Sequence, residues 1–251
     1  MRKKKIKFVI HLLFVIGVSL LSFPVIKNTL TLIRIQTTKV VVSSELPPQK
    51  PNEIIHLPTL ENYLYTSSES IGEAIGEIVI PSQNINTPIF AGLNNDQMLF
   101  GVGSMYPERN PETENMLLFG HHLGMAEILL GNVTNLEVGD KIYVKYLSKG
   151  LNYEVVENKL VMETDFSVLE NTDHPQLTII TCNQPTITDK RIVIVAKLLD
   201  EVEEHIEHIQ QRNENNDRKI MRRSIVKYSV VPILIILFIL MIGNYTIWRY
   251  V

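Results

Sequence analysis

The stretch TIITC at residues 178–182 is a short apolar, strand-like run that ends in the chain's single cysteine, Cys182. The segment Phe119–His122 (FGHH) lies upstream of it, and Arg191 opens the next apolar run downstream. Thiol-based acyl transfer needs a cysteine nucleophile and a base that moves its proton. A lone cysteine with a histidine and an arginine elsewhere in the chain is therefore a candidate for that chemistry.

Two long apolar runs enclose the middle of the chain. Residues 8–26 and 228–248 contain no Lys, Arg, Asp or Glu. Each is close to the roughly 20 apolar residues that a membrane-spanning helix needs. The predicted organisation is a cytoplasmic basic tail (1–7), a transmembrane signal anchor (8–26), an extracellular spacer (27–73), a folded domain (74–199), a helical polar connector (200–226), a second transmembrane helix (227–248) and a short tail (249–251).

The charges that flank these runs bear on orientation. Five basic residues within 2–7 precede the first run, which predicts a cytoplasmic N-terminus by the positive-inside rule. No alanine occurs before Ala74, so the small-residue pattern of a cleaved signal peptide is missing. A second basic cluster within 218–227 has the opposite bias. Because the first helix usually dominates, we predict a two-pass protein with both termini cytoplasmic and the folded domain outside.

The spacer and the connector are read from composition. The spacer contains Pro47, Pro48, Pro51 and Pro58 with little periodicity, which predicts an extended linker with a short helix near its end. The spacer contains no aromatic or acidic segment that identifies a lid over an active site. In the connector, apolar residues recur at helical spacing from Leu199 amid glutamates, which predicts an amphipathic helix.

The folded domain consists mainly of short strand patterns. Alternating or apolar runs separated by turn residues cover 76–81, 88–92, 98–103, 115–119, 141–147, 151–156, 177–181 and 191–196. Short strands with turns between them predict an all-β antiparallel sandwich or barrel. Helix is expected only in short pieces, around 96–100 and 125–130.

A cysteine-containing segment and five further segments in one order carry a resemblance to the sortases, transpeptidases that attach surface proteins to the Gram-positive cell wall. Residues 178–182 resemble the family's cysteine signature. The others are 75–81 (its opening strand), 118–122 (its histidine loop) with the following turn at 136–143, 164–169 (the segment before the cysteine strand) and 190–193 (its arginine strand). The resemblance covers about Ile75 to Leu198. It implies a sortase-type eight-stranded β-barrel, with a few short helices and here flanked by the two transmembrane helices.

The resemblance also implies an LPxTG-like sorting signal as substrate, cut between Thr and Gly. Cys182 is then the nucleophile that forms the acyl thioester. His121, directly after the glycine as in the family, is the proton donor and acceptor, and Arg191 holds the substrate carbonyl or oxyanion. Thr181 and His122 are the predicted substrate-binding residues. The implied partners are LPxTG-bearing surface proteins, a lipid-linked peptidoglycan precursor or other amine acceptor, and the membrane of a Gram-positive bacterium.

Several alternatives stay open from the sequence. An isolated cysteine is commonly a buried small hydrophobe, and His122 competes with His121. We expect no cofactor; Glu108, Glu112 and Glu163 offer oxygen ligands for calcium only as a weak alternative. The C-terminal membrane helix is more typical of class C, the pilus-building sortases, whereas the absence of an Asp-Pro pair favours class A anchoring. A plain cysteine protease and a non-catalytic binding module are further alternatives, and no nucleic-acid motif is present.

Overall fold

The computed structural model describes residues 2–48, 51–126, 128–147, 149–199, 219 and 221–250. The chain forms two compact units, one of Met1–Gln36 with Met221–Val251 and one of Thr37–Ile220. We call them the helical pair and the barrel unit. The predicted connector falls mainly on residues 200–218 and 220, which lie outside the described residues.

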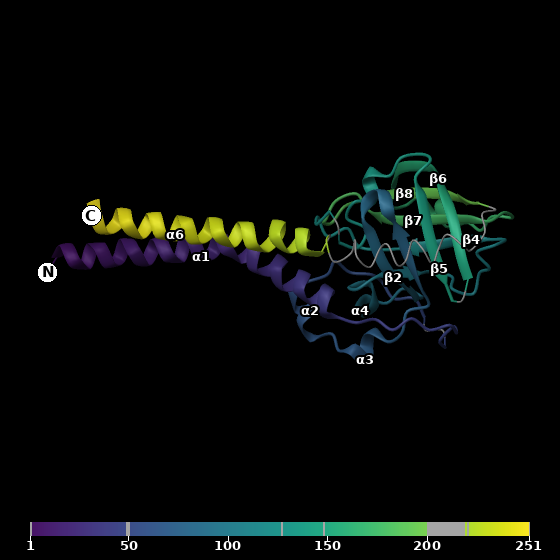
Figure 1. Ribbon diagram of the computed structural model, residues 1–251, viewed down its shortest axis with the longest axis horizontal. Helices are drawn as coiled ribbons and strands as arrows, with labels where there is room; N and C mark the ends of the chain where they lie inside the picture. The colour runs from purple at the N-terminus through teal and green to yellow at the C-terminus, as the bar shows by residue number, and fades with distance from the viewer. Residues whose placement is uncertain are drawn as a thin grey trace. The chain divides into compact units, whose positions relative to one another are not determined.

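The barrel unit is a closed barrel with the strand order β1-β2-β3-β4-β7-β8-β6-β5 (Figure 1). This confirms the predicted eight-stranded β-barrel. Two pairs of neighbouring strands run parallel, β2 with β3 and β4 with β7, whereas the turn signals in the sequence predicted an antiparallel sandwich or barrel. The strands are β1 (Gly76–Ile80), β2 (Ile85–Ala91), β3 (Val102–Ser104), β4 (Asn115–Phe119), β5 (Lys141–Tyr146), β6 (Lys149–Met162), β7 (Gln176–Cys182) and β8 (Lys190–Leu198).

The core explains why these segments form strands. β-Branched residues fit the pleated, half-buried surface of a sheet, and the barrel interior is filled largely by them. Ile78, Ile89, Val144 and Ile194 are 0% exposed, and each such side chain contributes roughly 1.5–3 kcal/mol of burial free energy.

Short helices lie beside the barrel. They are α2 (Leu60–Tyr65), α3 (Ser68–Ile71), α4 (Asn95–Met98) and the 3-10 turns η1 (Pro81–Gln83), η2 (Val133–Asn135) and η3 (Phe166–Leu169). α4 lies where a helix was predicted at 96–100. Around 125–130 the described residues form turns instead.

The region predicted as a spacer, 27–73, differs from an extended linker. Its first part continues helix α1 (Arg2–Thr37), and the rest belongs to the barrel unit. Thr59 closes a capping box with Asn62 at the start of α2. Tyr63, 2% exposed, meets the ring of Phe100 edge-on at 6.0 Å. Burial of one aromatic side chain holds this segment on the barrel, a contact that hydropathy patterns do not reveal.

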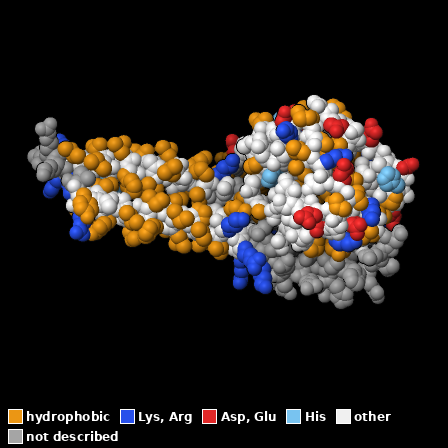
Figure 2. Space-filling view, turned by 90° about the horizontal axis from the view of Figure 1, so that it is seen from above, with side chains coloured by type: hydrophobic (Ala, Val, Ile, Leu, Met, Phe, Trp, Pro, Cys, Tyr) orange, Lys and Arg blue, Asp and Glu red, His pale blue; other side chains and the backbone are white. Residues whose placement is uncertain are grey.

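The helical pair consists of α1 and of the π-turn η4 (Val226–Val230) followed by α6 (Val231–Tyr250). Lys7 Nζ donates to the carbonyl of Trp248 at 3.4 Å, so the start of α1 lies beside the end of α6. Exposed apolar side chains are spread over the visible face of the helical pair (Figure 2). Each helix is long and apolar enough to cross a membrane.

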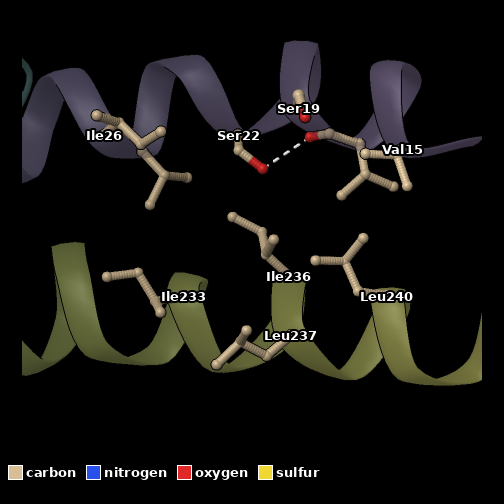
Figure 3. A pocket seen from close by; sticks show the side chains of 10 residues that line it. Val15, Ser19, Ser22, Ile26, Ile233, Ile236, Leu237 and Leu240 are labelled. Atoms are coloured by element: carbon tan, nitrogen blue, oxygen red, sulfur yellow. Dashed lines mark hydrogen bonds between the residues drawn. The ribbon is translucent and has the colours of Figure 1, made fainter. Parts of the chain in front are cut away.

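Between the two helices lies an apolar groove with two serines (Figure 3). Ser22 Oγ donates to the Val18 carbonyl at 2.7 Å. A hydroxyl bonded one turn back along its own helix carries no unsatisfied donor into an apolar environment. Gly243 leaves room for Phe14, because a Cβ there would lie 2.0 Å from the Phe14 ring.

Candidate active site

Strand pairing brings the three predicted catalytic residues together. Cys182 is the last residue of β7, and the antiparallel register with β8 places Arg191 directly opposite it. On the other side β4 runs parallel to β7 and ends at Phe119, which is paired with Ile180. The chain therefore leaves β4 through Gly120 and His121 beside the cysteine end of β7. Cys182, His121 and Arg191 all line one groove of about 690 Å³.

Gly120 and Thr181 fasten the histidine loop to the cysteine strand. Gly120 N–H donates to the Ile180 carbonyl at 3.2 Å, and Thr181 Oγ1 donates to the Gly120 carbonyl at 2.8 Å. Thr181 is 3% exposed. Its hydroxyl therefore serves the contact between the histidine loop and the cysteine strand, and the predicted role of Thr181 in substrate binding remains a proposal.

His121 is almost fully enclosed, with 8% of its surface exposed. Desolvation by burial lowers the pKa of His121 to about 4, because the charged imidazolium loses more hydration than the neutral ring. In the resting site at neutral pH the imidazole is therefore uncharged. A neutral imidazole has a free lone pair and can accept a proton from a nearby thiol.

His122 contacts the backbone of the cysteine strand. Its Nδ1 lies 3.1 Å from the Cys182 carbonyl oxygen. Because a carbonyl only accepts, Nδ1 carries the proton in this contact. His122 is absent from the groove lining, which includes His121. The structure thus places His122 as a backbone contact of the cysteine, and the predicted substrate contact remains a proposal.

Among the described residues, three hydrogen bonds hold Arg191. Nη1 donates to the carbonyls of Thr188 at 2.7 Å and Lys190 at 3.0 Å, and Nη2 donates to Glu163 Oε2 at 2.6 Å. A guanidinium has five N–H donors, so further donors can turn toward a substrate oxygen. The sequence singled out Glu163 only as a candidate calcium ligand. The length of β6, which ends at Met162, is what brings it to Arg191.

The remaining calcium candidates are not gathered at this groove. Glu112 forms an ion pair with Lys149, and neither Glu112 nor Glu108 lines the groove. Within the described part of the chain, no group of three or more His, Cys, Asp or Glu side chains is arranged to hold a metal ion.

One part of the groove wall was missed by sequence reasoning. Ile55, His56 and Leu57, from the region predicted as a spacer, line the same groove as Cys182. The only local signal is the apolar pair Ile55 and Leu57 two residues apart, followed by Pro58. A residue before proline favours extended backbone, but this pattern does not say where the segment lies.

Comparison with known proteins agrees with the geometry. The family model for the sortase domain matches residues 78–199. Sortase A of Listeria monocytogenes is 31% identical over 207 residues, which cover 79% of this chain and 92% of that protein. Sortase A of Streptococcus agalactiae is 33% identical over 130 residues, covering 49% and 52% respectively.

A solved structure gives the same result for the fold. The crystal structure of Listeria monocytogenes sortase A matches with a TM-score of 0.51 and 34% identity, over 53% of this chain and 94% of that one. The residues that the family model matches include Cys182, His121 and Arg191. The chain therefore belongs to the sortase family of cysteine transpeptidases.

Proposed function

We propose that this chain is a membrane-anchored sortase that cleaves an LPxTG-like signal between Thr and Gly and transfers the acyl group to a peptidoglycan amine. The observation that supports it best is the register that sets Arg191 opposite Cys182 while β4 delivers His121 to the other side. Nucleophile, base and cation meet in one groove.

The first half-reaction forms a thioester. The Cys182 sulfur bonds to the Thr carbonyl carbon while the thiol proton passes to the neutral His121. Arg191 donates to the oxygen that becomes an oxyanion. The Thr–Gly C–N bond then breaks, and His121 gives its proton to the departing Gly nitrogen.

The second half-reaction releases the enzyme. An amine nitrogen bonds to the thioester carbon, and its proton passes to His121. The C–S bond breaks and the proton returns to the Cys182 sulfur. Transfer to an amine rather than water distinguishes a transpeptidase from a plain cysteine protease.

The test uses the full-length chain in detergent micelles and a fluorogenic LPxTG peptide, with and without an amine acceptor. We expect cleavage that is faster with the amine, and an acyl adduct on Cys182 by mass spectrometry. Cys182→Ala should abolish both, and Arg191→Lys should lower the rate by roughly 100- to 1000-fold, the usual cost of an oxyanion donor. A chain that gives neither cleavage nor adduct contradicts the proposal. An equal rate without amine identifies a hydrolase instead.

We propose class A anchoring over pilus polymerisation. Similarity over 207 residues to a protein named sortase A, and the absence of an Asp-Pro pair, support this choice. The apolar helix α6 is the feature that favours the pilus-building alternative. The two acceptors differ chemically, so a competition between a small peptidoglycan-type amine and the lysine of a folded protein subunit decides between them.

A further inference from the structure

A segment of the chain that precedes the barrel strands lines the catalytic groove. We define residues 52–58 as the strap; of these, Ile55, His56 and Leu57 line the groove together with Cys182, His121 and Arg191. Ile55 is half-buried and Leu57 is 39% exposed, whereas the neighbouring Ile54 is 82% exposed. In extended chain, residues two apart share one face, so Ile55 and Leu57 form one apolar surface.

The start of the strap is fixed to the connection between β2 and β3. Glu53 N–H donates to the Leu93 carbonyl at 2.8 Å, and Leu93 N–H donates to Asn52 Oδ1 at 2.7 Å. The Glu53 carboxylate accepts from the backbone and side-chain N–H groups of Asn95, both at 2.9 Å. Asn52 and Glu53, at the start of the strap, are thus held by hydrogen bonds to Leu93 and Asn95.

The bonds continue to the residues that reach the groove. Asn95 Nδ2 also donates to the Ile54 carbonyl at 3.0 Å, and Asn95 Oδ1 accepts from His56 N–H at 2.9 Å. A single asparagine side chain therefore fixes the strap on both sides of Ile55.

The far end of the strap is fixed as well. Thr59 caps α2, and that helix buries Tyr63 against Phe100. Thr66 Oγ1 donates to Asp96 Oδ1 at 3.1 Å. Releasing the strap would break these bonds, each worth roughly 0.5–1.5 kcal/mol net, and would expose an aromatic ring. The strap therefore behaves as a fixed wall rather than as a removable cover.

We infer that the strap is a specificity-determining wall of the peptide groove, whose Ile55 and Leu57 contact the leucine side chain of the sorting signal. The inference rests on the proposed function for the identity of the peptide. Leucine is the one large apolar side chain that an LPxTG-like signal always presents, and an apolar surface two residues wide beside the nucleophile suits it. Loss of an apolar contact of this kind costs about tenfold in affinity.

The experiment measures binding separately from turnover. A fluorescent LPxTG peptide is titrated into the full-length chain carrying Cys182→Ala, and its Kd is read by anisotropy. We expect Leu57→Ser and Ile55→Ser each to raise Kd about tenfold, because each removes part of the apolar wall. Ile54→Ser is the matched control, since Ile54 lies on the same strap outside the groove, and its Kd should stay unchanged.

A peptide with alanine in place of its leucine completes a double-mutant cycle. If Leu57 contacts that leucine, the penalty for the alanine peptide shrinks in Leu57→Ser; fully additive penalties overturn the inference. An unchanged Kd in both strap variants also overturns the inference. A tighter Kd in both variants overturns it and indicates a removable lid. A Cys182→Ala chain that binds no peptide overturns it as well. Failure of the proposed function appears separately, as absence of cleavage by the wild-type chain.

Discussion

His121, the proposed base, is kept neutral by its burial in the barrel, and this burial has a measurable effect on stability. Its pKa is lowered to about 4 from the ordinary 6.5. Between these values the unfolded chain binds a proton that the folded chain does not. The contribution of the neutral His121 ring to the free energy of unfolding is therefore present above pH 6.5. It is lost as the pH falls, by roughly 2 kcal/mol between pH 6.5 and 5.

The measurement is urea unfolding of the barrel followed by near-ultraviolet circular dichroism across this pH range. Hydrogen bonds lower the pKa values of Glu114 and Glu154. These carboxylates therefore change the stability only below about pH 4.5, and the change between pH 6.5 and 5 reports on histidine. His121→Gln should flatten the pH dependence. His174→Gln, at an exposed histidine, should leave it as in wild type. An identical slope in His121→Gln would refute the burial argument.

At the scale of elements, Gly120 follows β4 directly and leaves no room for a larger side chain. A Cβ at this position would lie 2.6 Å from Leu130 Cδ1 and 2.8 Å from Val102 Cγ1. Gly120→Ala should therefore destabilise the barrel by about 1–3 kcal/mol, the usual cost of overpacking. Because His121 is the next residue, cleavage should fall further than stability accounts for.

A matched control is Gly139→Ala, where a Cβ would meet nothing within 4 Å but the backbone φ of +97° is strained for alanine. That variant should lose stability and keep the rate per folded molecule. If Gly120→Ala also keeps that rate, the loop does not position His121.

The strands and the meeting of Cys182, His121 and Arg191 in one groove were predictable, but the strap was not. Cys182, His121 and Arg191 each follow or open an apolar strand pattern, so local sequence already places them at strand ends. The strap has no such period. Its place depends on the side chain of Asn95 meeting Glu53 and the backbone of Ile54 and His56. Bonds between residues some forty positions apart leave no local pattern.

Glu163 is a second residue whose partner in the fold could not be predicted from the local sequence. Its carboxylate was grouped with other loop acids as a weak calcium ligand, because sequence shows charge but not partners. In the fold, Glu163 N–H donates to the Asp189 carbonyl at 2.7 Å, and its carboxylate meets Arg191. The pairing of β6 with β8 creates this contact, and pairing of distant strands is what single-sequence reasoning does not supply.

At the scale of the whole molecule, two apolar helices and one cysteine make the proposed topology testable. The Lys7–Trp248 contact places the start of α1 beside the end of α6, so if both helices span the membrane these ends share a side. Basic residues before α1 favour the cytoplasm for that side. We propose that the barrel unit lies outside the cell and that both ends of the chain lie inside.

The test replaces the native thiol by single cysteines in a Cys182→Ala background. Ile187 is 88% exposed on the barrel unit, so Ile187→Cys should react with a membrane-impermeant maleimide in intact cells. Lys4→Cys and Tyr250→Cys should react only after permeabilisation, because the bilayer shields both ends. If Tyr250→Cys is labelled in intact cells and Lys4→Cys is not, the N-terminal and C-terminal ends lie on opposite sides of the membrane. Protection of Ile187→Cys would place the barrel, and with it the proposed cell-wall reaction, on the wrong side of the membrane.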